Sequence, residues 1–312
     1  MADIAQDALI SSDDRASLGA SKLFFALWNS AFEHAEGTLG GDADALHDMR
    51  VNLRRLRTAM NNFEGPKSSP LLSKSLRLEI RGARTDIGKL GDKLGAVRDF
   101  DVLEDYVRAY AKKQLKAEIE SAPGLSLLLQ TLQNERDHAF APMQKALKKA
   151  EKEDGLHEEF GRWSLGIPAA KSSEMSYRDA AKIVLAARLE EVFSHQESLA
   201  VGAEEEEQHE LRKSLRRVRY TLETMSVCFE KPIKPMVKTL VEMQDTLGEM
   251  QDRAVLQSVV NRVFGEEKRP ADVAQFIAHG EKRKSYLLGQ TRTLWKNSES
   301  SGFWNELRAA IQ

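Results

Sequence analysis

Two matching stretches of sequence decide the fold: His47-Asp48-Met49-Arg50-Val51-Asn52-Leu53-Arg54-Arg55-Leu56-Arg57 and His209-Glu210-Leu211-Arg212-Lys213-Ser214-Leu215-Arg216-Arg217-Val218-Arg219. In each copy, Arg follows the His after three, seven, eight and ten positions, and apolar residues follow it after two, six and nine. Steps of three and four residues place side chains on one face of an α-helix. The repeated stretch therefore predicts two equivalent basic helices, one in each half of the chain.

The overall composition favours a helical globular protein whose anion site, if it has one, is local. Of the 312 residues, 41% are hydrophobic and 30% are charged, and Pro and Gly number only 8 and 19. The formal net charge of -2 argues against a surface that is basic throughout, as nonspecific nucleic-acid binding would need. The single Cys228 excludes an internal disulfide and a thiolate metal cluster.

Features of membrane insertion and export are missing from the sequence. It contains no run of about 18 apolar residues, the length that a spanning helix needs. The first residues, Met1 to Asp7, are acidic and lack the basic and apolar regions of a signal peptide. We therefore expect a cytoplasmic protein without membrane contact.

The remaining apolar patterns predict an all-α protein built from two similar halves. A second segment, Leu94 to Leu103, recurs as Leu247 to Leu256 with Leu, Gly, Asp, Val and Leu in common. Short connections between helices are typical of antiparallel bundles. We predict two four-helix bundles related by a pseudo-two-fold axis, over residues 1–170 and 171–312, with a linker at 163–173. The predicted helices span 16–38, 43–62, 125–153, 176–198, 271–295 and 303–311. One more predicted helix carries Leu76 and ends near Ile119. The second basic helix ends before Pro232.

On a helical wheel, the basic residues of each copy form a stripe that borders the buried face. In the first copy the stripe is about 15 Å long, at 1.5 Å per residue. Arg55 and Arg217 point elsewhere. The stripes contain His47, Arg50, Arg54 and Arg57 in the first copy and His209, Arg212, Arg216 and Arg219 in the second.

The neighbouring helices carry basic residues in a similar position. Arg81 and Arg84 each follow a residue of the apolar stripe by one, as do Lys234 and Lys238 in the second half. If these helices are neighbours, the stripes line a shared groove. Like charges so close together repel one another unless something pairs with them. Arg keeps its charge and presents a planar fork that suits phosphate, so the groove favours a linear polyanion.

Several other interpretations of these residues compete with the groove. An Arg beside a buried face often pairs with carboxylates across a bundle. A metal site would need several ligands, and no such cluster accompanies His47 or His209. His209-Glu210-Leu211-Arg212 is similar to a histidine-kinase phosphoacceptor box, but Lys213-Ser214 follows instead of Thr-Pro. Asp99 and Asp252 could act as general bases, but capping or pairing with motif arginines is favoured.

The four motifs follow one another along the chain in the order His47–Arg57, Leu94–Leu103, His209–Arg219 and Leu247–Leu256, and in that order they resemble those of the CHAD domain, the conserved histidine α-helical domain. The resemblance spans nearly the whole chain and implies two four-helix bundles around a basic pore or groove that binds inorganic polyphosphate, in association with polyphosphate granules.

Some family members carry an N-terminal triphosphate tunnel domain with catalytic activity, and we expect none here, because the similar region begins near residue 16. One departure is Gln251, which stands where the first half has Arg98. By motif match the binding residues are His47, Arg50, Arg54, Arg57, His209, Arg212, Arg216 and Arg219, and the stripe geometry adds Arg81, Arg84, Lys234 and Lys238.

The sequence therefore predicts a non-catalytic polyphosphate-binding protein with no cofactor and no metal. Nucleic acid is a rival ligand, but single strands usually need aromatic stacking platforms, and only Phe63 and Tyr220 lie near the stripes. A phosphate-cleaving enzyme would need a metal-binding carboxylate cluster or an activated nucleophile. A scaffold at granule surfaces is a further alternative, which sequence does not separate from storage or regulation.

Overall fold

Helices form the regular structure in the computed structural model, which describes residues 9–66, 69–115, 122–169, 175–200, 203–230, 232–265 and 269–310. Over these ranges the only β-pairing is an isolated bridge between Arg15 and Ser176. The prediction of an all-α protein is confirmed. None of the helices in these ranges is long and apolar enough to cross a lipid bilayer.

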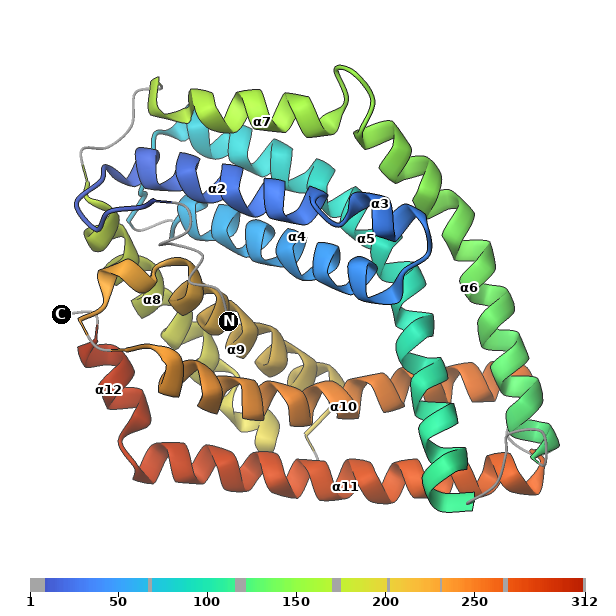
Figure 1. The fold of residues 1–312 in the computed structure, drawn as a ribbon. Helices are drawn as coiled ribbons and strands as arrows, with labels where there is room; N and C mark the ends of the chain where they lie inside the picture. Colours follow the sequence, from blue (N-terminus) through green and yellow to red (C-terminus); the bar gives the residue numbers. More distant parts are fainter. Residues whose placement is uncertain are drawn as a thin grey trace.

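One group of helices surrounds the first part of the core. It contains α2 (Ala16–Phe32), α3 (Ala35–Leu39), α4 (Ala43–Glu64), the first part of α5 (Lys74–Tyr110) and α7 (Leu156–Gly166) (Figure 1). Asp42 caps α4 by accepting hydrogen bonds from the backbone N–H groups of Asp44 and Ala45. Gly65 ends α4 at a φ of 70°, which glycine adopts without strain. These signals fix where the first basic helix begins and ends.

A second group of helices has its own core. It contains α8 (Tyr177–Ser194), the basic helix α9 (Glu205–Thr224), α10 (Lys234–Phe264), α11 (Ala271–Ser300) and α12 (Phe303–Ala309) (Figure 1). Trp295 and Trp304 lie against each other in this core, with ring centroids 5.2 Å apart. Short helical turns η4 (Gln196–Leu199) and η5 (Ser226–Cys228) flank α9.

A third core joins the two groups where their longest helices meet. The far ends of α5 and α10 pack there with α6 (Pro123–Ala150) and α11, through residues such as Val107, Leu125, Val260 and Phe276. Near this core α5 continues into a π-helical turn, η1 (Ala111–Leu115). Figure 1 shows α6 crossing from one group to the other. The long helices thereby hold α4 and α9 at a fixed relative position.

The structure corrects some of the predicted element boundaries. The predicted linker at 163–173 is wrong in its first part, because Trp163 to Gly166 belong to α7 and Ile167–Ala169 form the short helix η3. Gly, Pro and Ser suggested a loop, but Trp163 stacks on Phe24 with ring centroids 6.3 Å apart, which anchors the segment. The predicted helix over 16–38 is split between α2 and α3. Some predicted features lie outside the described residues. They are the helix ends near Ile119 and Ile311, the end of the linker and the Met1–Asp7 stretch.

Candidate anion-binding site

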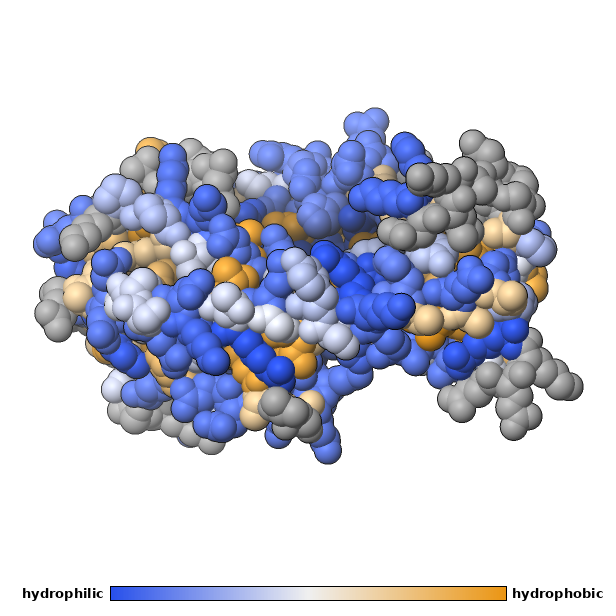
Figure 2. All heavy atoms as spheres, turned by 90° about the horizontal axis from the view of Figure 1, so that it is seen from below, coloured by the Kyte–Doolittle hydropathy of each residue, from blue (hydrophilic) through white to orange (hydrophobic). Residues whose placement is uncertain are grey.

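A basic cavity of about 460 Å³ lies between α4 and α9, and we call it the central cavity. Each of the two helices contributes three side chains from the repeated stretch, and α5 and α10 complete the wall. On the face shown in Figure 2, strongly hydrophilic side chains gather near the middle of the molecule. The basic side chains that line the cavity are His47, Arg50, Arg54, Arg98, His209, Arg212 and Arg216.

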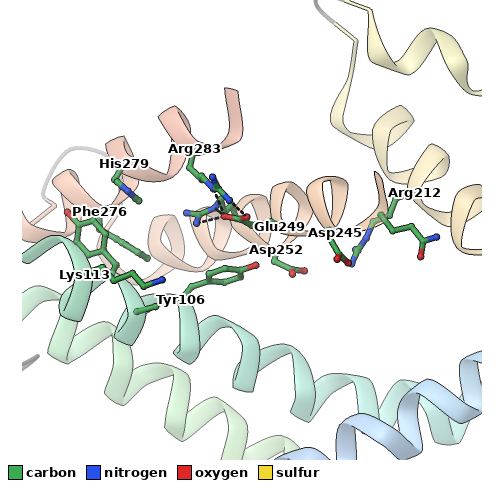
Figure 3. Close-up of a pocket in the computed structure, with 14 residues that line it drawn as sticks. Tyr106, Lys113, Arg212, Asp245, Glu249, Asp252, Phe276, His279 and Arg283 are labelled. Carbon is green, nitrogen blue, oxygen red and sulfur yellow. Dashed lines mark hydrogen bonds and ion pairs between the residues drawn. The ribbon is translucent and has the colours of Figure 1, made fainter. Parts of the chain in front are cut away.

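Two further cavities, which we call the first and second arms, share lining residues with the central cavity. The first arm, of about 350 Å³, shares Arg50, Arg54 and Asp99 with it and adds Arg57. The second arm, of about 750 Å³, shares Arg212 and Asp252 with it and extends between α10, α11 and the end of α5 (Figure 3). We call the three cavities, which are linked by these shared lining residues, the basic path.

Glycines on α5 and α10 make room for the arginines of the path. A Cβ atom on Gly95 would lie 3.2 Å from Nη2 of Arg50, and one on Gly248 would lie 2.9 Å from Nη2 of Arg212. These are equivalent positions in the two halves, which gives a physical reason for the repeated Leu-Gly pair. Arg57 lies over Gly88 in the same way, with Nη2 3.4 Å from the Cβ position.

We expect Gly248→Ala to weaken anion binding while stabilising the fold. The new methyl group forces the Arg212 guanidinium away from α10, which should lower affinity for tripolyphosphate about fivefold or more. Alanine is better than glycine inside a helix by about 1 kcal/mol, so the free energy of unfolding should rise. Calorimetric titration and urea unfolding measure the two effects.

Gly289→Ala is the matched control for this substitution. It lies in α11, where no heavy atom comes within 4 Å of the Cβ position. It should raise stability and leave affinity unchanged. Unchanged affinity in Gly248→Ala would show that the position of Arg212 over Gly248 is unimportant for binding.

Buried positive charge in the central cavity is only partly compensated. The Nε atom of Arg54 is buried and has no hydrogen-bond partner among the described residues. Burial, Arg54 and Arg212 together lower the pKa of Arg216 to about 10. Burial alone would raise the pKa of Tyr220, but the neighbouring Arg54 and Arg219 lower it. The free protein therefore holds guanidinium groups together at an electrostatic cost that an anion would relieve.

Two carboxylates also face the central cavity. Asp99 Oδ1 lies 2.9 Å from Nη1 of Arg50, which confirms the predicted pairing of Asp99 with a motif arginine. Burial raises the pKa of Asp252, and Asp99 raises it further, while Arg212 lowers it. No group of three or more His, Cys, Asp or Glu side chains in the described ranges could hold a metal ion.

Both motif histidines lie at the cavity with lowered pKa values. For His47 the causes are burial and the positive charges of Arg98 and Arg54. For His209 they are burial and the charges of Lys213 and Arg212. Each imidazole is therefore held toward its neutral form, from which it can still donate one hydrogen bond.

The remaining predicted site residues lie away from the central cavity. The Nε atoms of Arg81 and Arg84 lie 3.2 and 2.8 Å from the carboxylate of Glu64. Arg219 forms an ion pair with Glu223 at 3.5 Å and lies over the ring of Tyr220. Lys234 and Lys238 are exposed at the start of α10, where Lys238 lies 4.0 Å from Glu242. None of these five residues lines the central cavity or its two arms.

The wheel also placed Arg55 and Arg217 outside the stripes, and the structure agrees. Nε of Arg55 donates to Glu223 at 3.1 Å, and Arg217 pairs with Glu191 on α8. Sequence reasoning missed Arg98 as a residue of the cavity wall, although its place in the repeated Leu94–Leu103 segment was a usable signal.

The fold and the cavity define an all-α protein with a basic cavity between two groups of helices. This chain belongs to the CHAD domain family, whose model matches residues 23–261. The crystal structure of the CHAD domain from the plant Ricinus communis is similar, with a TM-score of 0.63 and 21% identity, covering 97% of this chain and 93% of that chain. PptA from Streptomyces chartreusis is also similar, with a TM-score of 0.66 and 12% identity, covering 92% of this chain and all of that chain (100%). No curated protein sequence matches this chain.

Proposed function

We propose that this protein binds inorganic polyphosphate, without cleaving it, in the central cavity and its arms. The observation that carries the proposal is the meeting of α4 and α9, which places six basic motif side chains around one cavity. Among them are the partly buried guanidinium groups of Arg54, whose Nε lacks a partner, and of Arg216, whose pKa is lowered by burial and by Arg54 and Arg212. Membership of the CHAD domain family supports the proposal, because that resemblance implies polyphosphate binding. We further propose that the halves are two four-helix bundles related by a pseudo-two-fold axis, and that the protein is cytoplasmic and associates with polyphosphate granules.

A chain of phosphates matches the cavity better than an isolated phosphate. The central cavity and its arms run past basic residues of both halves in succession, and each repeating phosphate carries charge and acceptor oxygens. Arg forms charge-assisted hydrogen bonds with such oxygens, and these are roughly twice as strong as neutral ones. Binding should therefore be strong at low salt and should weaken steeply as salt competes for the phosphates.

Calorimetric titration with long-chain polyphosphate tests the proposal directly. We expect a saturable complex at low salt, a linear fall of log affinity with log salt concentration, and a higher melting temperature when polyphosphate is bound. Polyphosphate should displace RNA or single-stranded DNA, and these should fail to displace polyphosphate. The absence of a complex at low salt would refute polyphosphate binding. Release of orthophosphate in the presence of magnesium or manganese would refute the non-catalytic assignment.

We expect polyphosphate binding to take up protons at His47 and His209. In the free protein both pKa values lie below the ordinary value of 6.5. A bound polyanion favours the imidazolium form and therefore raises the pKa values of both histidines. The affinity should strengthen as the pH falls through the raised pKa values of the complex. It should level off once the pH is below the pKa values of the free protein. Titrations near pH 7 in buffers of different ionisation enthalpy measure the proton uptake.

The double substitution His47→Asn and His209→Asn should remove most of this uptake. His195→Asn is the control, because His195 lies at the end of α8 and does not line the central cavity or its arms. Uptake that persists in the double variant would assign the titrating groups elsewhere, for instance to Asp252.

A further inference from the structure

The two arms of the basic path differ in chemistry at positions that correspond in the sequence repeat. Gly91 lines the first arm three residues before Leu94, and Gln244 lines the second arm three residues before Leu247. Ala96 of the first arm corresponds to Glu249 of the second. The small residues Gly91 and Ala96 of the first arm are thus replaced by polar ones in the second arm, which is also the larger cavity. A phosphate chain can use the basic residues of both arms, but it gives no role to the amide group of Gln244.

One end of the second arm is aromatic. Tyr106 and Tyr110 come from α5, and Phe276 and His279 come from α11. The ring centroids of Tyr110 and Phe276 lie 4.9 Å apart, and those of Tyr110 and His279 lie 5.2 Å apart. Figure 3 shows Phe276 and His279 at the end opposite Arg212. The arm therefore leads from the basic central cavity to an aromatic wall.

Glu249 does not make the second arm repel anions, because two arginines neutralise it. Its carboxylate accepts from Nη2 of Arg253 at 2.8 Å and from Nη2 of Arg283 at 2.7 Å. Figure 3 shows this cluster at one side of the arm. The carboxylates of Asp245 and Asp252 lie between the aromatic end and Arg212, where they offer acceptors to hydroxyl groups.

Two buried nitrogen atoms of the second arm lack a partner among the described residues. They are Nε2 of Gln244, a residue that is 7% exposed, and Nδ1 of His279. Buried polar atoms are nearly always hydrogen-bonded, so a ligand would supply the missing partners: an acceptor for the Gln244 amide, and a donor or an acceptor for His279, whose Nδ1 takes either role with its tautomer. Planar heterocycles carry such acceptors at their edges and stack on aromatic rings.

We propose that the second arm binds the nucleoside of a nucleoside 5′-polyphosphate, whose phosphate chain enters the central cavity past Arg212. The base lies against the aromatic end beside His279, and Gln244, which precedes Asp245 on the Arg212 side of the arm, donates to a ribose oxygen. The ribose hydroxyl groups donate to Asp245 and Asp252, and the phosphates reach Arg212 and Arg216. At about 750 Å³ the arm is in the size range of small-molecule sites. This assignment rests on the proposed phosphate site of the central cavity.

The test compares adenosine 5′-triphosphate with inorganic tripolyphosphate, which has the same number of phosphates. In magnesium-free buffer we expect the nucleotide to bind the wild-type protein about tenfold more tightly, the gain that stacking of one base can supply. Guanosine 5′-triphosphate, tested alongside, shows which base edge fits beside His279. Equal or weaker binding of both nucleotides relative to tripolyphosphate would overturn the assignment.

Paired variants locate the nucleoside. Gln244→Leu with His279→Leu should remove the tenfold advantage and leave the affinity for tripolyphosphate unchanged. Arg57→Gln, in the first arm, should lower long-chain polyphosphate affinity and leave the advantage intact. If the advantage survives in the double variant, the nucleoside binds elsewhere.

The outcomes also separate this inference from the proposed function. Polyphosphate binding without a nucleotide advantage overturns the second-arm assignment alone. Nucleotide binding without a long-chain polyphosphate complex overturns the proposed function and leaves the second arm standing.

Discussion

Reversing the charge of Arg54 and Arg216 together should lower the affinity for long-chain polyphosphate by about a hundredfold or more. Both guanidinium groups line the central cavity, one from each basic helix. A hydrogen bond to a charged group contributes about 1.5–3 kcal/mol, and two such losses amount to about a hundredfold even at the lower limit. The introduced carboxylates also repel phosphate. Calorimetric titration of Arg54→Glu with Arg216→Glu at low salt measures the loss.

The fold should tolerate this double substitution, which keeps the experiment informative. Burial and the positive charges of Arg54 and Arg212 lower the pKa of Arg216, so like charges repel one another there. Glutamate at these positions would exchange like-charge repulsion for attraction to the remaining arginines. We therefore expect a circular dichroism spectrum like that of the wild-type protein and a melting temperature that is no lower. Arg54→Gln with Arg216→Gln, a milder change, should still lose much of the affinity.

A matched control separates the cavity from net charge. Arg162→Glu with Arg262→Glu changes the charge of the protein by the same amount at two exposed sites on α7 and α10. Neither residue lines the central cavity or its arms. We expect only a small loss of affinity. An equal loss in both double variants would mean that overall charge, and not the central cavity, drives binding.

The sequence was sufficient for the features that depend on a single helix. The period of Leu46, Met49, Leu53 and Leu56 marks the buried face of α4, and all four are buried. The wheel separated Arg55 and Arg217 from the stripes, and both pair with carboxylates outside the central cavity. Such features follow from spacing alone, because one helix sets the geometry of its own side chains.

Features that depend on how helices meet could not be predicted in the same way. Arg81 and Arg84 have the same wheel position as the cavity arginines, but α4 also brings Glu64 to them. The second arm draws on α9, α10 and α11 and also on α5, which lies far from them in the sequence. The third core is similar, since it joins the ends of α5, α6, α10 and α11. Pairing partners and cavities of this kind are properties of the packing and leave no periodic signal.

The contact between the two basic helices also depends on packing, and its disruption should have the largest effect on stability. Glu223 on α9 is buried, with a side chain that is 3% exposed. It accepts from Nε of Arg55 on α4 at 3.1 Å and pairs with Arg219 at 3.5 Å. Beside it, Nδ2 of Asn62 donates to Oγ1 of Thr221 at 2.9 Å. This polar contact joins the helices that form the central cavity, although like charges on both would drive them apart.

We expect Glu223→Leu to lower the free energy of unfolding by about 3 kcal/mol or more, because it leaves Arg55 and Arg219 without their shared carboxylate inside the interface. Urea unfolding followed by circular dichroism measures the loss.

The control Glu158→Leu removes an exposed partner of Arg162 and should change stability by less than about 1 kcal/mol. Adding Arg55→Met to Glu223→Leu should recover part of the loss, since an apolar pair no longer strands a buried charge. A loss in Glu223→Leu no larger than in the control would mean that α4 and α9 are held together by apolar packing, without a contribution from this ion pair.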